Sequence, residues 1–205
     1  MKLILASASS RRADLLAQAG IPFEVIVPLV SEKVEGYASP EERVHLVAEK
    51  KVIDVAGNLR NGFVVAADTV VYVGGRMLGK PVDRREAFEM LRFLAGRQHE
   101  VLTGLVICDA ATQRRENGVE KTFVWMKNLT DRQISAYVAT GEPLDKAGAY
   151  GIQGKAALFI EKIYGCYSNV VGLPLGLLFD LMTHLNVPLW FNRKDGEHAE
   201  WSNND

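Results

Sequence analysis

Hydrophobic and polar residues follow two periodicities along this chain, and segments of the two kinds alternate. Runs with the apolar character of strands occupy residues 3–6, 23–27, 63–73, 100–108, 121–125 and 157–163. The pair Gly74-Gly75 separates the long run at 63–73 from a short apolar segment at 76–78, a pattern typical of a tight β-hairpin. The hairpin predicts that part of the sheet is antiparallel.

Helical periodicity fills most of the gaps between these runs. Polar capping residues mark three helix starts, at Ser39, Asp83 and Thr130. The first of these helices begins with a capping box and Pro40, and its apolar face comprises Val44, Val47, Ala48, Val52 and Val55. A further helix at 175–185 is apolar over most of its surface, which predicts a core position. Together the elements predict a three-layer α/β domain with a central mixed sheet.

Composition adds limits to this picture. The 205 residues are 48% hydrophobic and 24% charged, as in an ordinary globular protein. We expect a single domain at 1–190 and a loose polar tail at 191–205. The net charge of −1 gives no general attraction to nucleic acid or to a membrane surface, so we expect neither as a partner. Any phosphate-binding site must therefore be a local cluster.

Cysteines and apolar segments predict the compartment. Cys108 and Cys166 fit no metal or redox spacing, so we interpret them as free thiols in a reducing environment. The apolar stretch at 170–187 is interrupted by glycine, proline, aspartate and histidine, and the first residues do not resemble a signal peptide. The expected location is the cytoplasm.

The first candidate site lies where the apolar run at 3–6 meets a helical pattern. The residues at this junction carry hydroxyl and guanidinium groups: Ser7, Ser9, Ser10, Arg11 and Arg12. Free backbone N–H groups at a helix start bind anions, and guanidinium groups match phosphate oxygens. Taken alone, such a segment is better explained by an ordinary N-cap with solvated arginines.

The second candidate site involves Asp68 and Lys80. Asp68 stands inside an apolar strand, where a carboxylate is costly to bury unless it binds a metal, a proton or a donor. The hairpin turns the chain back, so Lys80 can approach Asp68 in space. A carboxylate and a lysine beside an arginine-flanked helix start suit a site for metal-bound phosphates.

The third candidate is the glycine-rich segment 141–154. It has no strong periodicity, and its length and apolar flanks favour a binding role over a flexible surface loop. It is not a P-loop, because the glycine spacing is wrong and Ala156 replaces the required hydroxyl residue. The chain also lacks serine-hydrolase, zinc-protease and dinucleotide-binding motifs.

Five blocks of the sequence, taken together, resemble the Maf family of nucleoside triphosphate pyrophosphatases. They are Ser7-x-Ser9-x-Arg11-Arg12, Ala67-Asp68-Thr69-Val70, Leu78-Gly79-Lys80-Pro81, the segment 145–154 and Val170-Val171-Gly172-Leu173-Pro174. The resemblance implies a fold like that of inosine triphosphatase, with two lobes around a nucleotide cleft. It also implies cleavage between the α and β phosphates, giving a monophosphate and pyrophosphate, with a divalent cation, Mg²⁺ or Mn²⁺. A house-cleaning role and a link to cell-division arrest are known of the family.

The resemblance also assigns roles to particular residues. Asp68 corresponds to the proton acceptor, and Arg11, Thr69 and Gln153 correspond to the positions that set base preference. Glu32, Lys50 and Lys80 match the remaining catalytic acid and lysines. Lys51 is adjacent to Lys50, and helix geometry does not exclude it. From this set we expect Asp68 and Glu32 to hold the cation, and Ser7 and Arg12 to bind substrate.

The segments around Asp68 and Gln153 resemble the branch that acts on dTTP and UTP. The amide of Gln153 can both donate and accept, which suits a uracil or thymine edge. Two alternatives stay open at this point: a purine-type enzyme acting on inosine or methylated guanosine triphosphate, and a nucleotide-sensing regulator of septation with little turnover. A homodimer is expected from the resemblance.

Overall fold

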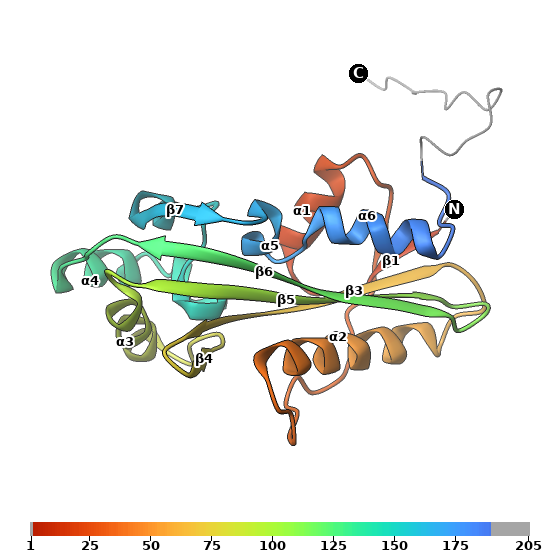
Figure 1. The fold of residues 1–205 in the computed structure, drawn as a ribbon, viewed down its shortest axis with the longest axis horizontal. Coiled ribbons are helices and arrows are strands. Elements are labelled where there is room, and N and C mark those ends of the chain that lie inside the picture. The colour runs from red at the N-terminus through yellow and green to blue at the C-terminus, as the bar shows by residue number, and fades with distance from the viewer. Residues whose placement is uncertain (1, 190–205) are drawn as a thin grey trace.

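A seven-stranded mixed sheet runs the length of the molecule (Figure 1). The structure, a computed structural model, describes residues 2–189. Its strands are β1 (Leu3–Leu5), β2 (Glu24–Val25), β3 (Phe63–Val73), β4 (Arg76–Leu78), β5 (Gln98–Asp109), β6 (Arg115–Met126) and β7 (Ile160–Tyr164). The order is β2-β1-β3-β5-β6-β7, with β4 paired to β3. The β1 pairings with β2 and β3 are parallel and the others are antiparallel.

The helices are α1 (Ser10–Gln18), α2 (Pro40–Ala56), α3 (Arg84–Leu94), α4 (Asp131–Ala139), α5 (Tyr167–Val171) and α6 (Leu175–His184), with 3₁₀ segments η1 (Glu142–Asp145), η2 (Ala147–Ala149) and η3 (Lys155–Phe159). Helices α2, α3 and α4 begin at the three caps that the sequence predicts. The side chains of Ser39, Asp83 and Thr130 each accept a hydrogen bond from a first-turn N–H. Several predicted strand boundaries are wrong: β2 is only two residues long, β6 begins at Arg115 instead of 121, and the chain at 157–159 completes η3 before β7 begins at Ile160.

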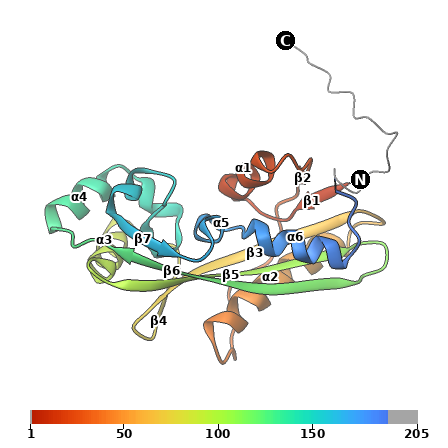
Figure 2. The ribbon, with the colours of Figure 1, turned by 45° about the horizontal axis from the view of Figure 1, so that its top comes forward.

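Helices cover both faces of the sheet, which confirms the predicted three-layer α/β architecture (Figures 1 and 2). Helix α2 packs on one face against alternate residues of β1, β3 and β5. Helices α1, α5 and α6 pack on the opposite face against the intervening residues of the same strands. A separate core forms at the far end of the sheet, where α3 and α4 pack with the ends of β3, β5 and β6.

The core position predicted for 175–185 is wrong for half of that helix. Leu178, Leu181 and Met182 of α6 are buried against the sheet. The opposite side, with Phe179 and Asp180, is exposed. The reason is that α6 forms the outer layer over β5 and β6, so one of its faces has no further layer to cover it.

A break in the sheet edge positions the site. β1 pairs with residues 63–65 of β3, and β4 pairs with residues 71–73 on the same side of that strand. The stretch of β3 between these two registers, which carries Asp68 and Thr69, is paired by neither. Because successive side chains point to opposite faces, Asp68 faces α2 whereas Thr69 faces α1 and α5. The break separates two lobes, as the resemblance implies.

Three further expectations concern the chain as a whole. Among residues 2–189, no helix has the length and apolar character needed to cross a membrane. The predicted polar tail, 191–205, lies outside the described residues. Both cysteines are free.

Candidate functional site

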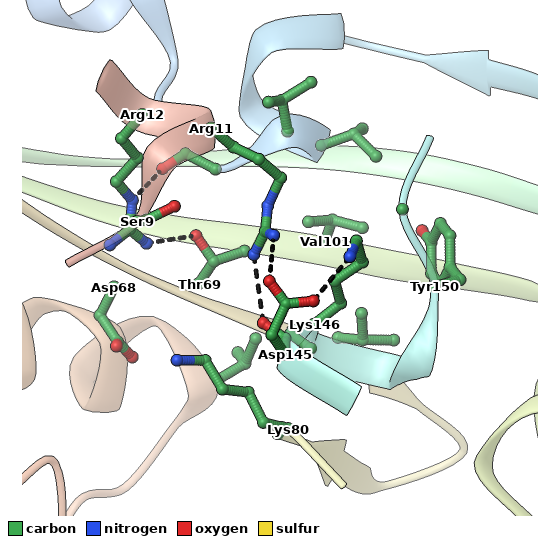
Figure 3. Close-up of a pocket in the computed structure, with 18 of the residues that line it drawn as sticks. Ser9, Arg11, Arg12, Asp68, Thr69, Lys80, Val101, Asp145, Lys146 and Tyr150 are labelled. Atoms are coloured by element: carbon green, nitrogen blue, oxygen red, sulfur yellow. Dashed lines mark hydrogen bonds and ion pairs between the residues drawn. The ribbon is translucent and has the colours of Figure 1, made fainter. Parts of the chain in front are cut away.

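A cavity of about 310 Å³ opens at the break in the sheet edge, between the two lobes (Figure 3). A second hollow of about 220 Å³ adjoins it at the start of α1. Seven residues line both spaces, and all but one carry charge: Ser9, Arg11, Arg12, Glu32, Lys51, Lys80 and Asp145. The two hollows therefore form one continuous cleft whose junction is predominantly cationic.

Arg12 anchors the start of α1 to the sheet. Its Nε donates to the Gly172 carbonyl at 2.7 Å, and its two terminal nitrogens donate to the hydroxyls of Ser7 and Thr69, each at 3.2 Å. Ser7 also accepts from the backbone N–H of Ser9. Burial lowers the pKa of Arg12, and the nearby carboxylates of Asp68 and Glu32 counteract this. Ser7, Arg12 and Thr69 are thus brought together as one hydrogen-bonded unit.

Asp68 is the most buried carboxylate of the cleft and has a cation on each oxygen. Lys51 Nζ lies 3.1 Å from Oδ1, and Arg43 Nη1 lies 2.6 Å from Oδ2. Lys51 also reaches Glu32 at 2.7 Å, so one ammonium group bridges the two predicted acids. Figure 3 shows the ammonium group of Lys80 directed toward Asp68, as the hairpin argument predicts.

The structure places Lys51, and not Lys50, at the site. Lys50 points out of the cleft and its Nζ donates to the Lys33 carbonyl at 3.3 Å. Lys51 is 5% exposed. The α2 periodicity contains the signal that separates them, because Lys51 falls within the stripe of Val47, Ala48 and Val55 whereas Lys50 falls outside it. The assignment of Lys50 is therefore corrected to Lys51.

Arg43 is a site residue that the sequence analysis missed. It lies in α2, two helical turns before Lys51, so both side chains reach the same region of β3. The spacing of eight positions between Arg43 and Lys51 only weakly predicts that Arg43 belongs to the site. The position of α2 across β3 is what brings Arg43 to Asp68.

The electrostatics of the cleft keep Glu32 ionised around neutral pH. Partial burial raises the pKa of Glu32, but Lys51, Lys80 and Arg12 outweigh that effect and lower it. In residues 2–189 no group of three or more histidine, cysteine or acidic side chains is placed to hold a metal. Two carboxylates close enough to share one ammonium group nevertheless fit Mg²⁺ or Mn²⁺, which take their remaining ligands from water and substrate phosphates.

Arg11 crosses the cleft to the glycine-rich segment. Its guanidinium group donates to the side chain of Asp145 at 2.6 Å and to the Asp145 carbonyl at 3.1 Å. Burial raises the pKa of Asp145, but hydrogen bonds from Lys146 and Arg11 more than compensate and lower it to about 2. The segment 141–154 is built from η1, η2 and turns, so the ion pair fixes an ordered wall of the cleft.

The cavity has a less charged end near Val101 and Tyr150 (Figure 3), and the remaining predicted residues, Thr69 and Gln153, also line the cavity. Gln153 is exposed and lines the cavity beside Ile152. Thr69 Oγ1 lies 2.9 Å from Thr103 Oγ1, beneath the cavity wall. Tyr150, which lines the same space, is held from behind by buried His99, with 2.7 Å between Nε2 and the phenol oxygen. Apolar side chains of β3, β5 and α5 complete this end.

The fold and this cleft define an α/β protein with a predominantly cationic cleft between two lobes. The profile of the family described as Maf-like protein matches residues 2–185. The chain belongs to this Maf family, as its motifs suggest.

Curated relatives cover nearly the whole chain. The dTTP/UTP pyrophosphatase of Pelotomaculum thermopropionicum is 49% identical over 88% of this chain and 95% of its own. The dTTP/UTP pyrophosphatase of Acetivibrio thermocellus is 50% identical over 91% and 96%, respectively. Among solved structures, the Staphylococcus aureus Ham1 protein covers 90% of this chain and is itself covered completely, with a TM-score of 0.51 and 15% identity. That similarity supports the fold alone.

Proposed function

We propose that this protein is a nucleoside triphosphate pyrophosphatase that hydrolyses dTTP and UTP to the monophosphate and pyrophosphate. The observation that carries the proposal is the single cleft in which two carboxylates, Asp68 and Glu32, face the cations Arg12, Lys51 and Lys80. Relatives with this printed activity, at 49% and 50% identity over most of the chain, support the substrate assignment.

The cationic junction suits a triphosphate chain. The backbone N–H groups at the start of α1, together with Arg12 and Lys80, would bind phosphate oxygens and stabilise the departing pyrophosphate. Asp68 and Glu32 would hold Mg²⁺ or Mn²⁺, which when bound neutralises phosphate charge and lowers the pKa of water. Asp68 accepts the proton of the water that attacks the α-phosphorus.

The less charged end of the cavity suits a pyrimidine base. Gln153 offers a donor and an acceptor at its mouth, and Thr69 offers a hydroxyl. Arg11, which Asp145 fixes at the junction of the two hollows, limits the width of the cleft. We assign these three residues to base preference.

A panel of nucleotides tests the proposal. Purified protein with Mg²⁺ or Mn²⁺ is incubated with canonical and modified triphosphates, and all phosphate products are resolved. Monophosphate and pyrophosphate from dTTP and UTP are expected, and they are expected to disappear in Asp68→Asn. Preference for inosine or methylated guanosine triphosphate would contradict the pyrimidine assignment. Tight binding without turnover would contradict enzymatic function and favour a septation regulator.

We further propose that the protein works in the cytoplasm and as a homodimer. Two unpaired cysteines and a nucleotide substrate support the compartment. Analytical ultracentrifugation tests the dimer directly, and a monomer mass at micromolar concentration would refute it.

A further inference from the structure

Arg43 stands in a position that the proposed reaction does not explain. Its Nη1 donates to Asp68 Oδ2 at 2.6 Å, one of the shortest ion pairs of the cleft. The other oxygen of Asp68 is bonded to Lys51. Both oxygens of the proposed base and cation ligand are therefore occupied by the protein's own cations. A divalent cation that binds Oδ2 therefore meets the positive charge of Arg43 directly beside it and competes with the guanidinium group for this oxygen.

The geometry of Arg43 is compatible with leaving. Its side chain is 20% exposed, lines the cavity and comes from the first turns of α2. Within residues 2–189, the guanidinium group has Asp68 as its one hydrogen-bond partner, so rotation breaks a single contact. Lys51 differs in both respects, because it is nearly buried and also contacts Glu32 and the Ala67 carbonyl.

We propose that Arg43 is a placeholder for the divalent cation, meaning that its guanidinium group neutralises Asp68 while no cation is bound and is displaced when the cation binds. This inference rests on the proposed function, since it assumes that Asp68 is a cation ligand. A buried carboxylate without a partner is strongly destabilising, and a cation supplied by the chain removes that cost until the cleft is filled. The guanidinium group therefore competes with the metal for the same oxygen.

Competition between Arg43 and the cation predicts the direction in which Mn²⁺ affinity changes when Arg43 is replaced. Replacing Arg43 by Gln frees Oδ2 and removes a positive charge that faces the incoming cation, so Mn²⁺ should bind more tightly without any nucleotide. Even with the screening of bulk water, removal of one unit charge that faces a divalent cation at a few ångströms corresponds to a Kd lower by about tenfold or more. Arg43→Lys keeps the charge and should change the Kd less than Arg43→Gln.

Electron paramagnetic resonance of free Mn²⁺ measures the Kd of Mn²⁺ in the nucleotide-free protein. Arg92→Gln is the matched control, because Arg92 forms an exposed ion pair with Asp131 far from the cleft. Thermal unfolding of each variant verifies the fold. Tighter Mn²⁺ binding in Arg43→Gln and not in Arg92→Gln supports the placeholder. Unchanged or weaker binding in Arg43→Gln, or equal tightening in the control, overturns it.

The two proposals fail in different ways. If wild-type protein hydrolyses dTTP and UTP while Arg43→Gln leaves Mn²⁺ affinity unchanged, the placeholder alone is refuted. If no nucleotide is hydrolysed, the proposed function is refuted whatever the affinity shows. We also expect Arg43→Gln to lower the Mg²⁺ concentration that gives half-maximal UTP hydrolysis, because the same competition is removed.

Discussion

At the scale of single residues, the cleft is organised around the ammonium group of Lys51. This group bridges Glu32 and Asp68 and also lies near the Ala67 carbonyl. Without it, two carboxylates would face each other in a partly desolvated space, and like charges that close oppose ionisation. Lys51 therefore offsets the repulsion between the two acids that we propose as cation ligands.

The adjacent lysines provide a matched pair of variants. We expect Lys51→Gln to lower kcat/KM for UTP by about a hundredfold or more, the order found when one preorganised charged donor is removed. Lys50→Gln should leave activity near that of the wild type, because Lys50 lies outside the cleft. Steady-state kinetics with a melting curve for each variant measures both. Equal losses in the two variants would refute the assignment of Lys51.

At the scale of elements, α2 is held against the sheet by backbone contact at Gly104 of β5. A Cβ at Gly104 would lie 2.5 Å from the carbonyl atoms of Val44, closer than such atoms approach. The absence of a side chain thus lets α2 lie close enough for Arg43 and Lys51 to reach Asp68. The position of Gly104 in β5 beneath α2 therefore determines where Arg43 and Lys51 lie relative to Asp68.

Gly104→Ala tests this contact. The added methyl must displace α2, so we expect a loss of about 1–3 kcal/mol in the free energy of unfolding, together with reduced turnover. Gly176→Ala in α6 is the control, because a Cβ there meets nothing within 4 Å. The control should gain about 0.5–1 kcal/mol through helix propensity. Urea denaturation measures both, and an unchanged Gly104→Ala variant would contradict the contact.

His99 of β5 connects the sheet to the glycine-rich wall through Tyr150. Burial lowers the pKa of His99 to about 4, so the folded protein holds it neutral where the unfolded chain is protonated. Stability is therefore complete above pH 6.5 and falls as the pH drops toward 4. From pH 7.5 to pH 5 we expect this group to cost about 2 kcal/mol. In His99→Gln this share of the pH dependence should vanish in chemical denaturation, and its persistence would exclude His99 as the source.

At the scale of the whole molecule, the cleft is the place where two lobes with separate cores meet. One lobe contributes α1 and α2, and the other contributes the turn after β4 and the glycine-rich segment (Figure 1). A ligand that spans the cleft contacts both lobes, so its binding energy stabilises the folded molecule as a unit.

The stabilisation of the folded protein by a bound ligand measures how the cleft couples the two lobes. An α,β-methylene analogue of UTP, at a hundred times its Kd, should raise the free energy of unfolding by about 2.7 kcal/mol in one cooperative transition. Lys80→Met should have wild-type stability without ligand, because Lys80 is exposed, but a smaller ligand-induced shift. Calorimetry in the presence of Mg²⁺ records both. Stabilisation of one lobe alone, seen as two transitions, would contradict binding across the cleft.

Much of this protein is determined by its sequence alone. Periodicity and capping residues give the order of strands and helices, and the Gly74-Gly75 hairpin gives the return of the chain at β4. The serine and arginine residues at the start of α1 and the acid within β3 identify two walls of the cleft. These signals are readable because each depends on residues a few positions apart, where backbone geometry fixes the relation between side chains.

The tertiary structure alone decides how these parts combine. It selects Lys51 over Lys50, pairs Arg43 with Asp68, and joins Arg12 to the Gly172 carbonyl, 160 positions along the chain. It also leaves residues 66–70 of β3 between the registers of β1 and β4, which creates the cleft. Such relations depend on strand register and helix packing between distant segments, and local periodicity contains no measure of either.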